Sequence, residues 1–151
     1  MTRCLIFCLA LTAAAGCKRQ ASTALDSAWG EFADFYERFH QDSAYQMAHI
    51  AFPLEGLPQN ADSATIAAGT FRWTPENWVI QHGFDLASSD FDHQLIPIGE
   101  DFMYEKLIHR AGDLAIVRRF AKLDGEWHLI YYAGLNMIRK EDSGIHIDGG
   151  F

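Results

Sequence analysis

The sequence predicts an α+β fold in which N-terminal helices pack on one face of a curved antiparallel sheet. Apolar residues recur at spacings of three and four between Leu25 and Phe39, which indicates an amphipathic helix near the N-terminus. The C-terminal third contains three strand-length runs separated by turn-forming residues. These runs span residues 102–110, 114–123 and 127–135. Helices followed by a meander of strands are typical of this fold class.

The first helix is predicted to begin at Ser22–Thr23, because serine and threonine side chains cap helix N-termini. Acidic residues such as Asp34 lie largely outside its apolar stripe and are expected to form a solvated face. A second cap, Asp42–Ser43, precedes a short helix over residues 44–50, which ends before Phe52–Pro53 because proline cannot continue a helix. The apolar stripe of the first helix contains Leu25, Ala28, Trp29, Phe32, Phe35, Tyr36 and Phe39.

The middle of the chain contains short and irregular elements. Residues 53–68 are rich in Pro, Gly, Asn, Asp and Ala, and we expect an irregular or loosely helical excursion there. Residues 70–74 alternate between polar and apolar side chains, which indicates a short strand. Residues 95–98 indicate another, and Pro97 is expected to keep it at an edge of the sheet because proline lacks a backbone N–H.

The last two strands are predicted to form a hairpin, because Asp124–Gly125 suits a type I′ turn, in which both central residues need positive φ. In the last strand both faces carry apolar side chains, so we expect the second face to contact a loop, the 53–68 excursion or another subunit. Residues 139–151, with three glycines and weak periodicity, are expected to form a flexible tail. One face of the last strand would carry Trp127, Leu129, Tyr131 and Ala133, and the other His128, Ile130 and Tyr132.

Length and charge limit the classes of protein to which the chain can belong. A chain of 151 residues with 49% hydrophobic and 21% charged residues fits one globular domain. Its net charge of −8 argues against a nucleic-acid binder, because such proteins need a basic surface to contact phosphates. We therefore expect no nucleic-acid partner.

The N-terminus has the three regions of a secretory signal peptide. Met1–Arg3 carries a positive charge, residues 4–15 are apolar or small, and the chain becomes polar from Lys18. The apolar run is too short to cross a bilayer, which needs roughly 20 residues of helix. We therefore expect residues 1–16 to be a signal peptide and Cys17 to begin the mature chain.

The sequence Ala14–Cys17 resembles the lipobox of bacterial lipoproteins, in which the signal is cut just before a cysteine that receives a diacylglyceryl group and an N-acyl chain. The resemblance implies lipidation of Cys17, a lipidated tether over residues 17–23 and stable attachment to a membrane. Lys18–Arg19 is similar to the signals that direct lipoproteins to the periplasm-facing leaflet of the Gram-negative outer membrane. Because the two other cysteines leave with the signal, the mature domain is expected to fold without disulfides.

The first part of the mature chain contains the runs DFYERFH at 34–40, DSAYQ at 42–46 and IAFPL at 50–54. These runs resemble the DUF4348 lipoproteins of Bacteroidetes, which are similar in fold to the NTF2-like superfamily. The final hairpin, with Lys122–Leu129 and the pair Tyr131–Tyr132, also resembles the last strands of NTF2-like domains. The resemblance implies an NTF2-like (cystatin-like) cone over residues 24–138, in which a bent sheet wraps around helices and leaves a pocket. It supplies no catalytic residues, because NTF2-like domains use this pocket for several chemistries or for binding alone.

The sequence contains no motif for metal or nucleophilic catalysis. Its seven histidines include no HxH or HExxH pattern, and no serine lies in a G-x-S-x-G motif. We therefore assign no metal ligands, no cofactor and no catalytic residues. A buried carboxylate would be the general base if the domain were an enzyme, and Asp34, Asp85 and Glu105 are open candidates.

Aromatic residues are the best candidates for the lining of a small-molecule pocket. Gln46 and His49 would supply polar contacts. The alternative is that the aromatic side chains fill the cone and form its core, which a domain without disulfides needs. The candidate aromatic residues are Tyr45, Trp73, Trp78, Trp127 and Tyr131.

These observations together predict a membrane-anchored periplasmic lipoprotein that binds a small ligand or an envelope partner. One alternative is a small-molecule isomerase, dehydratase or hydrolase with a buried carboxylate in the cone. Another is a structural subunit that forms a homodimer through the outer face of the sheet. A cavity that contains a desolvated carboxylate favours the enzyme, a cavity without one favours binding, and a filled cone favours neither.

Overall fold

The computed structural model describes residues 16–83, 85 and 88–137. Residues 1–15 of the predicted signal peptide and the whole predicted tail at 139–151 lie outside this part of the chain. The described residues form three helices and six strands. In chain order these are α1 (Gly16–Gln41), α2 (Ser43–Ala48), β1 (Ile50–Leu57), α3 (Ser63–Ala68), β2 (Arg72–Trp73), β3 (Phe91–Pro97), β4 (Phe102–His109), β5 (Leu114–Leu123) and β6 (Glu126–Met137).

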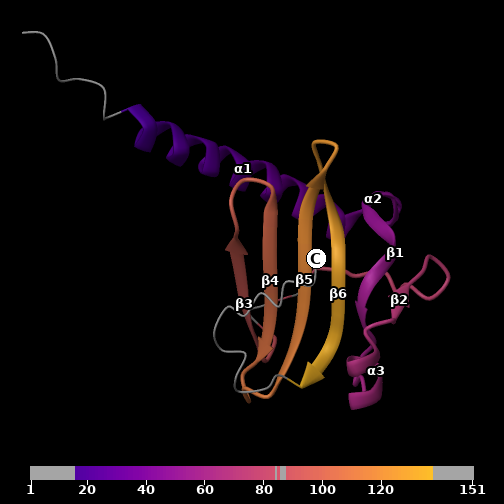
Figure 1. Cartoon of the computed structure of the whole chain (residues 1–151). Helices are drawn as coiled ribbons and strands as arrows, with labels where there is room; N and C mark the ends of the chain where they lie inside the picture. Colours follow the sequence, from indigo (N-terminus) through magenta and orange to yellow (C-terminus); the bar gives the residue numbers. More distant parts are fainter. Residues whose placement is uncertain (1–15, 84, 86–87, 138–151) are drawn as a thin grey trace, which may run out of the picture.

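The six strands form one sheet with the order β2-β1-β6-β5-β4-β3. β1 and β6 are parallel, and the other neighbouring strands are antiparallel. Figure 1 shows that α1 crosses the sheet near the β5–β6 turn and that its N-terminal part extends beyond the sheet. The predicted fold class, α+β with N-terminal helices on an antiparallel sheet, is confirmed, with β1 and β6 as the one parallel pair among the described strands.

Helix α1 is longer than the sequence predicts. It begins at Gly16 rather than at Ser22–Thr23. Residues 17–23, which were expected to form a tether, are therefore part of a continuous helix. The lipidation of Cys17 stays a prediction.

Two local signals in the sequence correctly placed the short helix α2 and the β5–β6 turn. The side chain of Asp42 accepts a hydrogen bond from the Tyr45 backbone N–H at 3.0 Å, as expected for an N-cap. Asp124 and Gly125 both have positive φ, 52° and 86°, as a type I′ turn requires. Both predictions rest on interactions between residues that are close in sequence.

Strand β1 corrects the prediction of an irregular excursion over residues 53–68. The first part of that range belongs to a strand in the sheet, although α3 fits the loosely helical part. Pro53 lies where the β1–β6 register shifts, between Ile50, which is opposite Leu129, and Glu55, which is opposite Tyr131. Proline is tolerated at such an irregularity because no ladder hydrogen bond is needed from its nitrogen.

Strand β6 also corrects the predicted assignment of side chains to faces. Leu129 is opposite Phe120 on β5, but the next β5 residue, Arg119, is opposite Tyr131, so β6 has one additional residue at this point. Such a bulge reverses which alternate side chains face inward. Leu129 and Tyr132 are therefore both buried, whereas Tyr131 lies on the outer face.

The edge strand β3 is longer than the predicted strand at 95–98. It pairs with β4 from Phe91, opposite His109, to Pro97, opposite Met103. β3 is at the edge of the sheet, as Pro97 predicted. The other predicted strands, at 70–74, 102–110, 114–123 and 127–135, correspond to β2, β4, β5 and β6.

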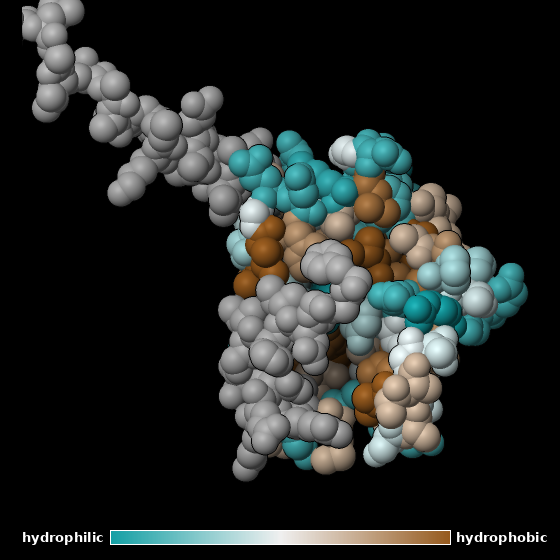
Figure 2. All heavy atoms as spheres, viewed as in Figure 1, coloured by the Kyte–Doolittle hydropathy of each residue, from teal (hydrophilic) through white to brown (hydrophobic). Residues whose placement is uncertain are grey.

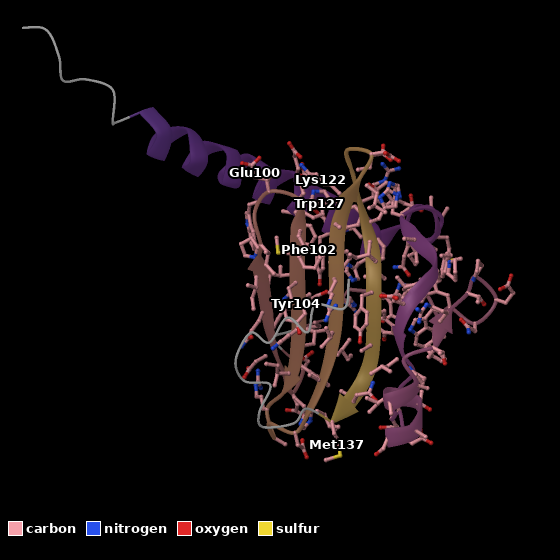
Figure 3. The ribbon with its side chains drawn as sticks, viewed as in Figure 1. Glu100, Phe102, Tyr104, Lys122, Trp127 and Met137 are labelled. Carbon is pink, nitrogen blue, oxygen red and sulfur yellow. The ribbon has the colours of Figure 1, made fainter. Side chains whose placement is uncertain are left out.

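The hydrophobic core lies between α1 and the end of the sheet that it crosses. The Phe32 ring meets the rings of Phe120 and Trp127 edge-on, with centroids 5.4 and 5.0 Å apart. Lys122 and Trp127 are partners across the β5–β6 hairpin (Figure 3), and the Lys122 ammonium bonds Glu31 of α1 at 2.6 Å. Burial of each large side chain contributes roughly 1.5–3 kcal/mol to stability. The part of α1 that contains Glu31 and Phe32 is therefore held firmly against β5 and β6. Figure 2 shows hydrophilic side chains along this end of the molecule and apolar ones below them.

Candidate functional site

A row of inward-facing polar residues crosses the centre of the sheet. Glu105 on β4 is the register partner of Arg118 on β5, and Arg118 is the partner of Tyr132 on β6. Register partners lie on the same face of a sheet, so all three side chains point toward α1. Glu105 is fully buried and Arg118 is 2% exposed. The Arg118 guanidinium donates to both oxygens of the Glu105 carboxylate, at 3.3 and 3.1 Å.

Three further side chains complete the cluster around this ion pair. The hydroxyl of Tyr36 on α1 donates to Glu105 Oε1 at 2.5 Å, and Nε2 of His93 on β3 donates to the same oxygen at 2.8 Å. His40, one turn after Tyr36, donates from Nδ1 to the Tyr36 carbonyl at 2.8 Å. Its Nε2 then accepts from the Arg118 guanidinium at 3.3 Å. The cluster therefore joins α1 to β3, β4 and β5.

The cluster keeps Glu105 ionised. Burial alone raises the pKa of a carboxyl, but the charge of Arg118 and the hydrogen bonds from His93 and Tyr36 outweigh it and lower the pKa of Glu105 to about 2. Burial and the charge of Glu105 raise the pKa of Tyr36 far above its usual range, so its hydroxyl stays protonated. Burial and the charge of Arg118 lower the pKa of His40, which favours the neutral ring.

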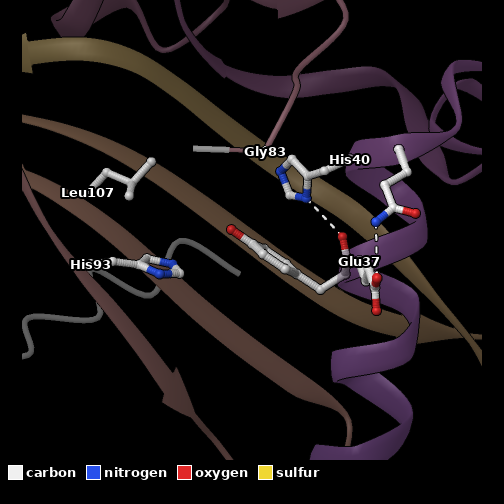
Figure 4. Close-up of a pocket in the computed structure, with 7 residues that line it drawn as sticks. Glu37, His40, Gly83, His93 and Leu107 are labelled. Atoms are coloured by element: carbon white, nitrogen blue, oxygen red, sulfur yellow. Dashed lines mark hydrogen bonds between the residues drawn. The ribbon is translucent and has the colours of Figure 1, made fainter. Parts of the chain in front are cut away.

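A pocket of about 300 Å³ lies beside this cluster, between α1 and the strands β3 and β4. Figure 4 shows His40, His93 and Leu107 around the space, with Glu37 on the helix side and Gly83 from the loop before β3. The Glu37 carboxylate accepts a hydrogen bond from Gln41 at 3.0 Å. The residues that line the pocket are Tyr36, Glu37, His40, Gln41, Gly83, His93 and Leu107.

A second pocket of about 200 Å³ lies on the β1–β6 side of the sheet. Trp73, Trp78 and Tyr132 form its aromatic wall, with ring centroids 5.2–5.8 Å apart. It shares no lining residue with the first pocket. The residues that line it are Gln59, Trp73, Trp78, Val79, Gln81, Tyr132 and Gly134.

Gln46, one of the sequence-predicted pocket residues, is fully buried and lines neither pocket. Its amide nitrogen donates to the carbonyls of Phe39 and Gln81, at 2.8 and 2.7 Å. Its oxygen accepts from the Trp78 indole at 3.1 Å and from the Gln81 N–H at 2.8 Å. Gln46 therefore fixes the loop that carries Trp78 and Gln81 against the helices.

The structure brings together two of the seven predicted pocket residues, Trp73 and Trp78, in the second pocket. Tyr45 and His49 stack on each other with centroids 3.8 Å apart, outside both pockets. Trp127 belongs to the core, as the alternative of a filled cone expected. Tyr131 lies on the outer face, where Arg119 stacks on its ring at 4.5 Å.

Sequence reasoning weighed Glu105 but did not find its partners Tyr36, His40, His93 and Arg118 as a site. Of the three candidate carboxylates, Asp34 and Asp85 are exposed and Glu105 is buried. A signal for Glu105 is present in β4, where it lies between the inward-facing residues Met103 and Leu107 in the strand's alternation. The contacts of Tyr36 and His40 join residues 69 and 78 positions apart, and no local pattern shows such contacts.

Within the part of the chain that the structure describes, no group of three His, Cys, Asp or Glu side chains is arranged to hold a metal ion. The helices of that part include none that is long and apolar enough to cross a membrane.

No protein-family model and no curated protein matches the chain. Two solved structures of proteins of unknown function are similar. One, from the DUF3225 family of Pectobacterium atrosepticum SCRI1043, is 12% identical over 78% of this chain and 93% of its own, with a TM-score of 0.35. The other, from Nostoc punctiforme PCC 73102 and described as having a cystatin-like fold, is 13% identical over 73% of this chain and 90% of its own, with a TM-score of 0.30.

The Glu105–Arg118 ion pair predicts non-additive effects on stability. Glu105→Leu or Arg118→Met leaves the other charge buried and unpaired, so each should lower the free energy of unfolding by about 3–5 kcal/mol. The double variant should lose much less than the sum of the two, because neither charge remains. Urea denaturation of the four proteins measures this, and a strictly additive double variant would show that the two charges are not coupled.

The buried His40 predicts a loss of stability in mild acid. The pKa of His40 is lowered in the folded protein. As the pH falls through the ordinary histidine pKa of 6.5, His40 therefore binds a proton in the unfolded chain before it does so in the folded protein. The stability contributed by the neutral ring is therefore present above pH 6.5 and decreases as the pH falls, by at most ~1.4 kcal/mol per pH unit.

Urea denaturation at pH 7.5 and at about pH 5.5, either side of the ordinary histidine pKa, should show a smaller pH dependence for His40→Gln than for the natural protein. His82→Gln, which changes an exposed histidine, serves as the control and should keep the natural pH dependence. An unchanged pH dependence in His40→Gln would contradict the assignment.

Proposed function

We propose that this chain is a lipid-anchored envelope protein whose domain binds a small organic molecule that donates hydrogen bonds. The observation that carries the proposal is the pocket of about 300 Å³ beside the buried Glu105–Arg118 cluster, with His40 and His93 in its wall. Its volume lies at the small end of the range of ligand sites. The cluster fixes the wall residues before any ligand arrives, which reduces the entropic cost of binding.

The hydrogen-bonding state of the wall residues indicates the ligand's chemistry. Both ring nitrogens of His40 are used within the cluster. His93 donates from Nε2 to Glu105, so in the neutral ring Nδ1 is an acceptor. The Glu37 carboxylate is a second acceptor at the wall. A ligand with amino or hydroxyl donors and an apolar part against Leu107 fits this arrangement.

The electrostatics of the pocket favour a neutral or cationic ligand over an anion. The described lining residues include the Glu37 carboxylate and no lysine or arginine. The positive charge of Arg118, behind the wall, is paired with Glu105. An anionic ligand would therefore find a like charge at Glu37 and no unpaired cation among these residues.

The state of Glu105 supports binding over the alternative of an isomerase, dehydratase or hydrolase that uses a buried carboxylate. A general base works best when its pKa is near the operating pH. With its pKa lowered to about 2, Glu105 is a weak base at neutral pH. Its oxygens also accept four hydrogen bonds from the protein, which leaves little capacity for a substrate proton.

The proposal includes the membrane anchor. Cleavage before Cys17 and its lipidation would attach the chain to a membrane, and the similarity of Lys18–Arg19 to known sorting signals favours the periplasm-facing leaflet of the outer membrane. α1 is continuous from Gly16 to the pocket residues Tyr36 and His40. At 1.5 Å per residue, the pocket would lie roughly 30 Å along the helix from the anchor. The homodimer through the outer face of the sheet stays an alternative form of this envelope role.

Three probes test the pocket: tyramine, phenethyl alcohol and phenylacetate. They share a benzene ring with a two-carbon arm and differ in charge and in hydrogen-bond donors, of which tyramine has an additional one in its phenol hydroxyl. Tyramine and phenethyl alcohol should shift the NMR signals of His93 and Leu107, with a Kd on the order of 1 mM. Phenylacetate should bind at least about tenfold more weakly, because of Glu37.

His93→Gln should lose the response to tyramine, whereas the exposed-site control His82→Gln should keep it. Stronger binding of phenylacetate than of the two donors, or shifts that do not involve His93 and Leu107, would contradict the proposal.

The anchor is tested separately by labelled palmitate in cells. The natural chain should incorporate the label, and Cys17→Ser should remain an unlabelled, uncleaved precursor. Cys8→Ser is the matched control, because it changes a cysteine of the predicted signal and should leave labelling intact. Normal processing of Cys17→Ser would refute the anchor.

A further inference from the structure

The second pocket supports an inference that does not depend on the function proposed for the first pocket. We propose that it binds a single neutral sugar ring. The pocket is separate from the site beside Glu105, since the two have no lining residue in common. It is formed by elements distant in sequence: Trp73 from β2, Trp78 and Gln81 from the following loop, and Tyr132 from β6.

The three aromatic rings of the pocket are fixed by hydrogen bonds made away from their faces. The Trp73 indole N–H donates to the Tyr132 carbonyl at 2.9 Å, and the Trp78 indole N–H donates to Gln46 at 3.1 Å. The Tyr132 hydroxyl donates to Gln81 at 3.3 Å. Because these polar groups already have partners, the aromatic part of the lining is apolar. Trp78 and Tyr132 are each only 8% exposed, so the half-buried Trp73 supplies most of the aromatic surface that a ligand can reach. The rings are steeply inclined to one another, with Trp73 and Trp78 at 90°.

The polar part of the lining consists of uncharged groups. The residues that form the pocket include two amides, Gln59 and Gln81, and no charged side chain. Gln59 is exposed at the rim, where its amide can both donate and accept hydrogen bonds. A charged ligand would lose its hydration here without gaining an opposite charge from the lining. The ligand class is therefore neutral.

A sugar ring has the two kinds of surface that this lining complements. Its axial C–H groups form an apolar face that can stack on an aromatic ring, and its hydroxyls are donors and acceptors for an amide. An organic cation is another ligand that aromatic rings bind, but the ring of Tyr132 already has the Arg118 guanidinium 5.9 Å from its centroid. That ring is therefore already in contact with a cation, and the lining supplies no carboxylate to hold a second one. The volume of about 200 Å³ limits the occupant to one ring.

The probes that test this are the methyl β-pyranosides of glucose, galactose and mannose and of N-acetylglucosamine, added to the full chain. At least one should change the NMR signals of the Trp73 and Trp78 indole N–H groups saturably, with a Kd on the order of 1 mM. Trp73→Leu should weaken that binding by at least about tenfold, because it removes an aromatic face. Trp29→Leu is the matched control at an exposed tryptophan of α1 and should bind as the natural protein does.

Gln59→Ala tests the same pocket with a substitution that leaves the hydrophobic core intact, because Gln59 is exposed. It should weaken sugar binding several-fold, whereas Gln94→Ala, at an exposed glutamine of β3, should not. The proposal is overturned if no sugar saturates the tryptophan signals by about 100 mM, a concentration far above the expected Kd. It is also overturned if tetramethylammonium or indole binds there more tightly than every sugar, or if Trp73→Leu and Gln59→Ala bind sugar as the natural protein does.

Discussion

The ion pair between Glu105 and Arg118 is the interaction on which the arrangement of this domain depends. A buried carboxylate and a buried guanidinium are costly to remove from water, and the cost is recovered only when each has further hydrogen-bond partners. Here those partners come from different elements: Tyr36 from α1 and His93 from β3. The pair therefore fixes the helix relative to the strands, in addition to the apolar packing of Phe32, Phe35 and Phe39 in the same part of α1.

Both pockets depend on this cluster, although they share no lining residue. On one side, Tyr36, His40 and His93 are members of the cluster and also form the wall of the larger pocket. On the other, the Gln81 side chain accepts hydrogen bonds from Arg118 and from Tyr132, at 3.4 and 3.3 Å. Gln81 and Tyr132 both line the smaller pocket. A charge held in place by four hydrogen bonds is suited to positioning wall residues, which favours a binding role over proton transfer by Glu105.

The sequence predicts those parts of the structure that local interactions determine. The Asp42 cap, the Asp124–Gly125 turn and the apolar stripe of α1 are visible because the interacting residues are neighbours in the chain or on one helix face. The sequence does not predict β1, because Pro53 is unfavourable in a regular strand and is accommodated only by the irregular register there. The faces of β6 differ from the prediction because β6 has one additional residue after Leu129. The site itself depends on strand register, which aligns Glu105 with Arg118 and Tyr132, and on the packing of α1, which adds Tyr36 and His40.

The ionisation of Glu105 in the folded protein tests this account most directly. With glutamate labelled by ¹³C at the side-chain carboxyl, the Glu105 signal can be followed by NMR during an acid titration of the folded protein. The signal should keep the chemical shift of a carboxylate well below pH 4.5, the ordinary glutamate pKa, with a midpoint at about 2. A midpoint at or above the ordinary value in the folded protein would show that Arg118, His93 and Tyr36 do not hold the charge, and would contradict the account.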